Sequence, residues 1–67
     1  MGIKFNDLRR CLLRLGFVER IRGSHHIFSK EGVEELINLQ RGGSNAKAYQ
    51  VRQVRAILKG YGFPGDS

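Results

Sequence analysis

The chain has 67 residues and a net charge of +6, the size of one small domain, which buries only about 60% of its unfolded surface. Its single cysteine excludes an internal disulfide, and one cysteine with two adjacent histidines does not make a tetrahedral zinc site. Because no apolar run approaches the ~20 residues of a membrane span and no signal-peptide core is present, we expect one cytoplasmic domain over residues 1–67, without metal or small-molecule cofactor.

The basic charge comes mainly from arginine, with eight Arg against four Lys. A surface this positive favours polyanionic partners, and the arginine fork binds phosphate in a bidentate manner and stacks on bases. No basic stretch is paired with a large apolar aromatic face, as a membrane-surface helix would be. The composition therefore favours nucleic acid as a partner and disfavours a membrane.

The first predicted element is a helix over residues 5–15. Asn6 or Asp7 can cap its start, and Gly16 ends it. Its apolar residues fall at i, i+3, i+4 and i+7, which is one helical face, and they are Leu8, Cys11, Leu12 and Leu15. On this stripe Cys11 is expected to be a buried, reduced thiol.

A hairpin is predicted next. Residues 17–22 form a short strand candidate, Gly23-Ser24 is a turn signal, and residues 25–29 form a second strand. Residues 30–32, Lys-Glu-Gly, then close a further turn, in which glycine suits the positive φ that such loops need.

Residues 33–40 fit either a helix or a strand. Val33, Leu36 and Ile37 would share a helical face, whereas Val33, Ile37 and Leu39 would share a strand face through Glu35. About eight residues between glycines suit a strand better than a free-standing helix. We predict a third strand here, followed by a flexible loop over 41–46.

A second helix is predicted to begin after a cap at Ser44 or Asn45 and to run through about Lys59. Its apolar stripe consists of Val51, Val54, Ile57, Leu58 and Tyr61. Two glycines end it and Pro64 prevents its resumption. The domain core then covers about residues 4–62, and residues 63–67 are expected to be a frayed tail.

The order helix, three strands, helix predicts an α+β domain with two helices on one face of a three-stranded antiparallel sheet. The other face of such a sheet stays open to solvent or to a partner. Successive strand residues point to opposite faces, so His25 and His26 cannot share one small site unless the strand is bulged. Alternation alone does not say which of the two lies on the helix-covered face.

RNA cleavage is the chemistry that fits these parts. RNA carries its own nucleophile, the 2′-OH, so the protein needs no metal. It needs a base to take that proton, cations to hold the phosphate and an acid for the leaving 5′-oxygen. A histidine can be the general base or acid, and arginines can stabilise the charge that develops on the phosphate. Two-metal chemistry is disfavoured, because the adjacent Glu34 and Glu35 would point to opposite faces of a strand.

The chain resembles the HicA family of toxins from HicA–HicB toxin–antitoxin pairs. Three segments carry the resemblance: the helix end Leu15-Gly16-Phe17, the stretch "RIRGSHHIF" and the closing "VRQVRAILKGYG". The resemblance implies a double-stranded-RNA-binding-domain-like α-β-β-β-α fold and a metal-independent mRNA interferase held inactive by a HicB-like antitoxin. The histidine that follows the Gly-Ser pair maps to His25.

One segment departs from the family pattern. Many members carry a Pro-His type segment after the third strand, where this chain has residues 38–43, "NLQRGG". This leaves a mechanism with a single histidine, or auxiliary roles for Arg41 and Lys47.

On this basis His25 is the expected catalytic residue of the endoribonuclease. The expected RNA-binding residues are Arg20, Arg22, Gly23, Ser24, His26, Arg41 and Lys47. The alternative is a non-catalytic double-stranded RNA-binding module, which reads A-form shape through phosphates and 2′-OH groups. The role of His25 separates the two, because a binding module does not need it.

Overall fold

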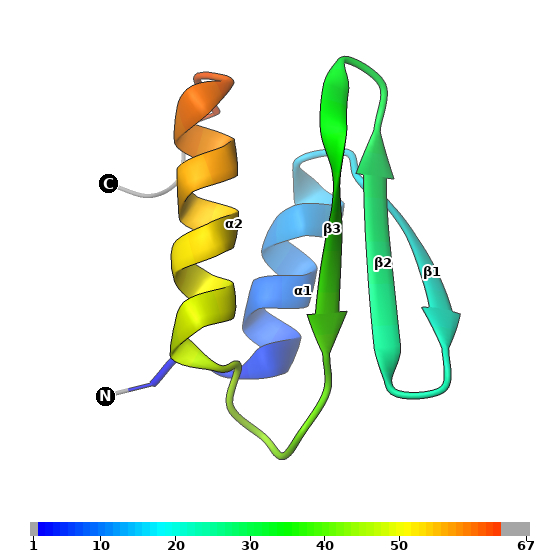
Figure 1. Ribbon diagram of the computed structural model, residues 1–67, viewed down its shortest axis with the longest axis vertical. Helices are drawn as coiled ribbons and strands as arrows, with labels where there is room; N and C mark the ends of the chain where they lie inside the picture. The colour runs from blue at the N-terminus through cyan, green and yellow to red at the C-terminus, as the bar shows by residue number, and fades with distance from the viewer. Residues whose placement is uncertain (1, 64–67) are drawn as a thin grey trace.

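The computed structural model describes residues 2–63 and has the predicted α-β-β-β-α order (Figure 1). The elements are α1 (Phe5–Arg14), β1 (Val18–Arg22), β2 (His25–Lys30), β3 (Val33–Gln40) and α2 (Ala48–Gly60). The three strands form one antiparallel sheet in the order β1-β2-β3. The α+β prediction is confirmed, and the ambiguous segment 33–40 is a strand.

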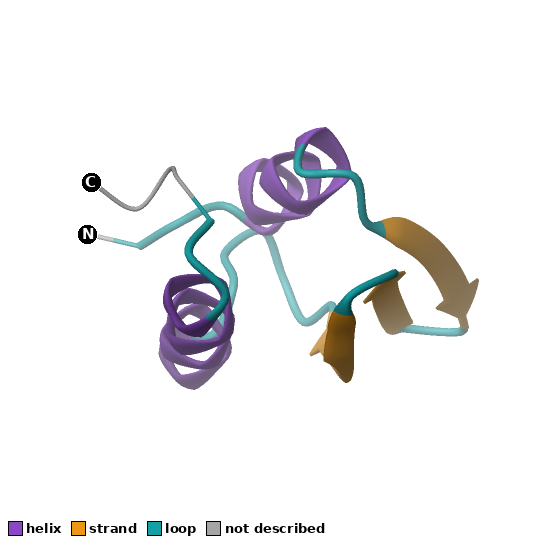
Figure 2. Ribbon diagram, turned by 90° about the horizontal axis from the view of Figure 1, so that it is seen from above, coloured by secondary structure: helices purple, strands orange, loops and turns teal. Residues whose placement is uncertain are grey.

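The core lies between one face of the sheet and the two helices. The sheet contributes Phe28, Ile37 and Leu39, which alternate with exposed or half-buried neighbours along β2 and β3. The helices contribute the buried side chains Phe5, Leu8, Leu12, Val54 and Leu58. Figure 2 shows both helices on the same side of the sheet, so they leave its second face uncovered.

Two tight turns set the register of the strands. Gly23-Ser24 joins β1 to β2 and brings Arg22 opposite His25. Gly23 has φ +58°, the positive value that a two-residue hairpin with glycine at its first central position requires. Between β2 and β3 the register shifts once, between Phe28 and Lys30, and His25 pairs with Gln40.

The predicted side-chain caps of both helices are wrong. The N-cap residues are Lys4 for α1 and Lys47 for α2, and neither makes a side-chain cap hydrogen bond. A contact between the chain start and the β3–α2 loop takes the place of a cap, because Lys4 and Asn45 form a β-bridge. Within it, the Phe5 amide donates to the Ser44 carbonyl at 2.9 Å, which satisfies one of the free donors at the start of α1.

Two predicted stripe residues are less buried than expected. Cys11 is half-buried, and Tyr61 is 41% exposed. The Tyr61 hydroxyl donates to Glu35 Oε1 at 2.7 Å and accepts the Glu34 amide at 3.2 Å, so it ties the end of α2 to the start of β3. Pro64 and most of the predicted tail lie outside the described residues. Over residues 2–63, no helix has the length and apolarity to cross a bilayer.

Candidate active site on the open face of the sheet

The two histidines lie on opposite faces of the sheet. His26 is 6% exposed and points toward the helices together with Phe28, whereas His25 is exposed on the face that the helices leave uncovered. We call this second face the open face. Strand alternation and register place on it Val18, Arg20, Arg22, His25, Ile27, Ser29, Leu36, Asn38 and Gln40.

Arginine and amide side chains surround His25 on the open face. Arg22 is its direct partner on β1 and Gln40 its direct partner on β3. One step along the sheet, Arg20 and Asn38 flank Ile27 in the same manner. Side chains on diagonal neighbours of a sheet are within reach of each other, so His25 lies between two exposed cationic groups on one side and two amides on the other.

One amide touches the imidazole directly. His25 Nδ1 lies 3.2 Å from Asn38 Oδ1, a hydrogen bond between exposed side chains. This bond links β2 to β3 across the open face.

His26 belongs to a buried polar cluster under the sheet. Its Nδ1 lies 2.8 Å from Glu19 Oε2, and its ring packs edge-on against Phe5 with centroids 4.9 Å apart. The same Glu19 oxygen accepts a hydrogen bond from Arg9 of α1. The Arg9 hydrogen bond holds the pKa of Glu19 below its usual value, and the His26 bond acts in the same direction against the cost of burial. This cluster ties α1 to the sheet, and the His26 side chain, 6% exposed, has little surface to offer to RNA.

Arg41 and Lys47 come from the β3–α2 loop, at the same end of the molecule as the Gly23-Ser24 turn (Figure 1). The Arg41 amide donates to the Ser24 carbonyl at 2.8 Å, which joins the loop to the turn. The Arg41 side chain runs toward α1, where it donates to Asn6 Oδ1 at 2.7 Å and lies over the Phe5 ring. Lys47 is exposed at the start of α2. These two cations therefore border the open face and do not lie within it.

The candidate site lies on an exposed face of the sheet. Two hollows of about 150 and 310 Å³ lie along α2, and neither is lined by a predicted site residue. The larger is bordered by the chain start and the first turns of α2. An open sheet face suits an extended polymer ligand better than a small enclosed molecule.

Asn38 and Gln40 were not among the predicted site residues. The signal is nevertheless present in the sequence: once Ile37 and Leu39 are assigned to the inner face of a strand, Asn38 and Gln40 must lie on the other. The sequence holds no comparable signal for the hydrogen bond between Arg9 and Glu19, because this contact depends on how α1 lies over the sheet.

Comparisons of the chain with protein-family models, with curated proteins and with solved structures find no match. The resemblance to HicA toxins therefore rests on the residues of this sequence.

Proposed function

We propose that this protein is an endoribonuclease toxin of the HicA type, which cleaves mRNA without a metal ion and is neutralised by a HicB-like antitoxin in the cytoplasm. The observation that carries the proposal is the exposed imidazole of His25 on the open face, beside two exposed arginines of β1. An accessible imidazole beside cations is what cleavage of RNA by its own 2′-OH requires.

In the proposed reaction His25 is the general base. It takes the proton of a 2′-OH, whose oxygen attacks the adjacent phosphorus and displaces the 5′-oxygen of the next nucleotide. The products are a 2′,3′-cyclic phosphate and a 5′-hydroxyl end. In-line attack puts the entering 2′-oxygen and the leaving 5′-oxygen on opposite sides of phosphorus. His25 therefore takes the proton of the entering oxygen, and the leaving oxygen takes a proton from water.

Arg20 and Arg22 supply the positive charge in this proposal. Both are exposed, and strand alternation places both on the face that carries His25. Arg22 is the closer of the two along the sheet, as the direct cross-strand partner of His25. Each guanidinium group can bind two phosphate oxygens. The negative charge on these oxygens grows during attack, so the arginines stabilise the transition state more than they stabilise the bound substrate.

The open face also offers a surface for the proposed antitoxin. Its other half carries Val18 and Leu36, the two most exposed large apolar side chains of the described residues, at 63% and 64%. Exposed apolar side chains beside a functional surface are typical of protein interaction sites. An antitoxin seated on Val18 and Leu36 would cover His25 at the same time.

The test is cleavage of a defined single-stranded RNA, with chelator present, by the wild type and by His25→Ala. We expect the wild type to leave cyclic-phosphate and 5′-hydroxyl ends, and the variant to cut about 10²–10⁴-fold more slowly, the usual contribution of general acid–base catalysis. Growth inhibition in cells should be lost in parallel. A variant that cuts at the wild-type rate would show that His25 is not the base.

The second candidate function is a double-stranded RNA-binding module. The contact between Arg41 and the Gly23-Ser24 turn favours it, because this contact gathers a basic loop at one end of the fold. In that case the wild type binds duplex RNA without cutting any RNA, and His25→Ala binds as the wild type does.

A further inference from the structure

We propose that Asn38 is a positioning residue for His25: it fixes the ring proton on Nδ1 and thereby leaves the lone pair of Nε2 free for the substrate. This inference rests on the proposed function for its catalytic consequence. The hydrogen bond itself, and the position of the ring proton that follows from it, concern the free protein.

The chemistry of the two atoms decides the direction of the hydrogen bond. An amide oxygen can only accept, and a neutral imidazole has one N–H donor and one acceptor nitrogen. Because His25 Nδ1 faces Asn38 Oδ1 at 3.2 Å, Nδ1 must carry the proton. Nε2 is then the basic nitrogen, as a general base requires.

The strand that carries Asn38 holds it firmly. Its neighbours Ile37 and Leu39 are 1% and 0% exposed in the core, so the backbone of Asn38 is fixed from the inner face. His25 pairs with Gln40, two residues further along β3, which places Asn38 on the diagonal from His25. A residue that packing locks in this manner holds a catalytic group in place better than a loop residue does.

Without this bond the proton distribution would reverse. The histidine side chain in water favours the form protonated on Nε2, which points the lone pair away from the substrate. A hydrogen bond of ordinary net strength changes such a ratio by about 2- to 12-fold. Replacement of Asn38 by leucine, which is of similar size and cannot accept, should therefore lower kcat while KM stays unchanged. The fall in kcat should be smaller than that factor, because kcat follows the fraction of His25 protonated on Nδ1 and not the ratio of the two forms.

An aspartate at position 38 should preserve the geometry and change the pH response. Its carboxylate accepts the same Nδ1 proton and in addition favours the positively charged ring. Since a general base must be neutral to act, the acid limb of the pH–rate profile of Asn38→Asp should move to higher pH by roughly one unit. Activity well above that limb should return to near the wild-type level, which a merely structural role for Asn38 would not predict.

The decisive measurement is ¹⁵N NMR of the histidine ring nitrogens in the full chain without RNA, with the His25 signals assigned through His25→Gln. We expect Nδ1–H in the wild type and in Asn38→Asp, and mainly Nε2–H in Asn38→Leu. Gln40→Leu is the matched control, because it removes an amide directly opposite His25 that makes no hydrogen bond to it among the described side chains. Its His25 signals should match the wild type.

Three results would overturn the inference: a wild-type His25 protonated on Nε2, an Asn38→Leu ring identical to wild type, or an equal change in Gln40→Leu. Failure of the proposed function would look different. If the wild type never cuts RNA but its Nδ1 proton depends on Asn38, the positioning role stands and the nuclease assignment falls.

Discussion

His25 and His26 are neighbours in the chain and differ in almost every physical respect. One is exposed and hydrogen-bonded to the Asn38 amide, whereas the other is buried against Phe5 and Glu19. The β-strand alone causes the difference, because it turns successive side chains to opposite faces. Substitution by alanine should therefore affect RNA cleavage at His25 and the stability of the fold at His26.

Substitution of His26 should affect stability and not chemistry. His26→Ala removes a buried ring and its hydrogen bond to Glu19, so we expect the free energy of unfolding to fall by about 1–3 kcal/mol. Urea unfolding measures the change. Cleavage per folded molecule should stay near wild type at low temperature.

His25→Ala is the control for this prediction, because truncation of an exposed side chain usually changes stability by less than about 0.5 kcal/mol. Equal destabilisation by both substitutions would contradict the assignment of His26 to the packed face.

Glu19 should make stability depend on acid. The Arg9 hydrogen bond lowers its pKa in the folded chain below the ordinary value of 4.5, so the unfolded chain binds a proton more readily. The stabilising contribution is then present in full above about pH 4.5 and is lost as pH falls through the folded-state pKa. Urea midpoints of the wild type and Glu19→Gln between pH 7 and pH 3 should converge in acid. A difference that is constant over this range would argue against the lowered pKa.

At the scale of the elements, the Gly23-Ser24 turn determines where His25 lies. Gly23 has φ +58°, and a side chain at that angle costs roughly 1–2 kcal/mol because Cβ approaches the backbone. Among the described residues other than Gly23 and its two chain neighbours, no heavy atom lies within 4 Å of the place that a Cβ would occupy, so the cost of Gly23→Ala is backbone strain and not collision. We expect a drop in stability of that size and slower RNA cleavage, since strain at the turn displaces Arg22 relative to His25.

Gly42→Ala is the matched control for the turn. This glycine also lies in a loop, its φ is not positive, and an added Cβ would meet only the Lys47 side chain at 3.6 Å, an ordinary contact. Its thermal midpoint should equal or slightly exceed the wild-type value. Equal losses at both glycines would mean that loop flexibility, and not the positive φ of Gly23, is what matters.

Strands and turns are easier to predict from this sequence than helix starts. The period-two pattern through Ile37 and Leu39, bounded by glycines, is sufficient for β3. The caps predicted at Asn6 or Asp7 and at Ser44 or Asn45 are wrong. A cap is inferred from local residues, whereas the Phe5 amide at the start of α1 donates to the Ser44 carbonyl, almost forty residues away in sequence. A local pattern cannot report a donor–acceptor pair that only the tertiary fold brings together.

The same limit applies to the candidate site. The Gly-Ser-His stretch of the sequence indicates His25 as a candidate, but it does not indicate which face of the sheet His25 occupies. The face depends on the burial of His26 against Phe5, which requires α1 to lie under β2. The position of Asn38 beside the imidazole depends on the register that pairs His25 with Gln40.

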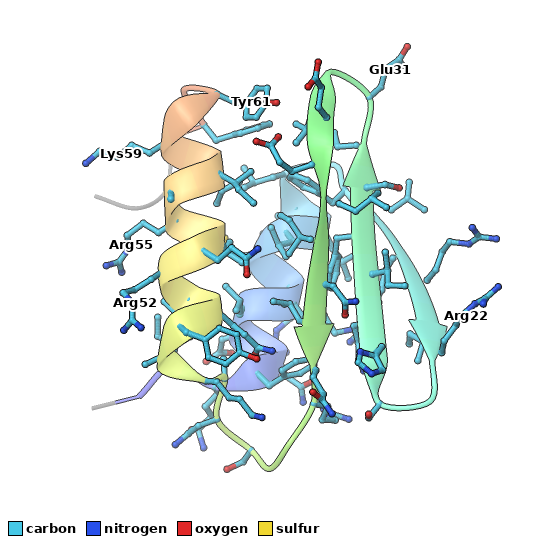
Figure 3. All side chains as sticks on the ribbon, viewed as in Figure 1. Arg22, Glu31, Arg52, Arg55, Lys59 and Tyr61 are labelled. Atoms are coloured by element: carbon cyan, nitrogen blue, oxygen red, sulfur yellow. The ribbon has the colours of Figure 1, made fainter. Side chains whose placement is uncertain are left out.

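At the scale of the whole molecule, exposed positive charge lies on more than one surface. Figure 3 shows Arg52, Arg55 and Lys59 projecting from the outer side of α2, while Arg22 projects on the opposite side of the molecule. All four are exposed. Net charge alone would attract RNA to either surface, whereas the proposed function requires the open face.

Salt dependence separates these two possibilities. Binding of single-stranded RNA releases counterions, so log affinity should fall linearly with log salt, with a slope of about −0.7 for each phosphate contacted. The double variant Arg20→Gln/Arg22→Gln should reduce the steepness of this slope by about 1.4, twice the contribution of one contact. Affinities are measured by fluorescence anisotropy at several salt concentrations, with His25→Ala as the background so that the RNA stays intact.

The double variant Arg52→Gln/Arg55→Gln removes the same net charge from the outer side of α2. If RNA lies on the open face, its slope stays at the wild-type value, because distant charges change the slope little once they are more than a Debye length of ~10 Å from the phosphates. Equal slope changes in both double variants would mean that RNA follows net charge. A change in the α2 variant alone would move the binding surface to the outer side of α2 and separate it from His25, which would remove the geometric basis for catalysis.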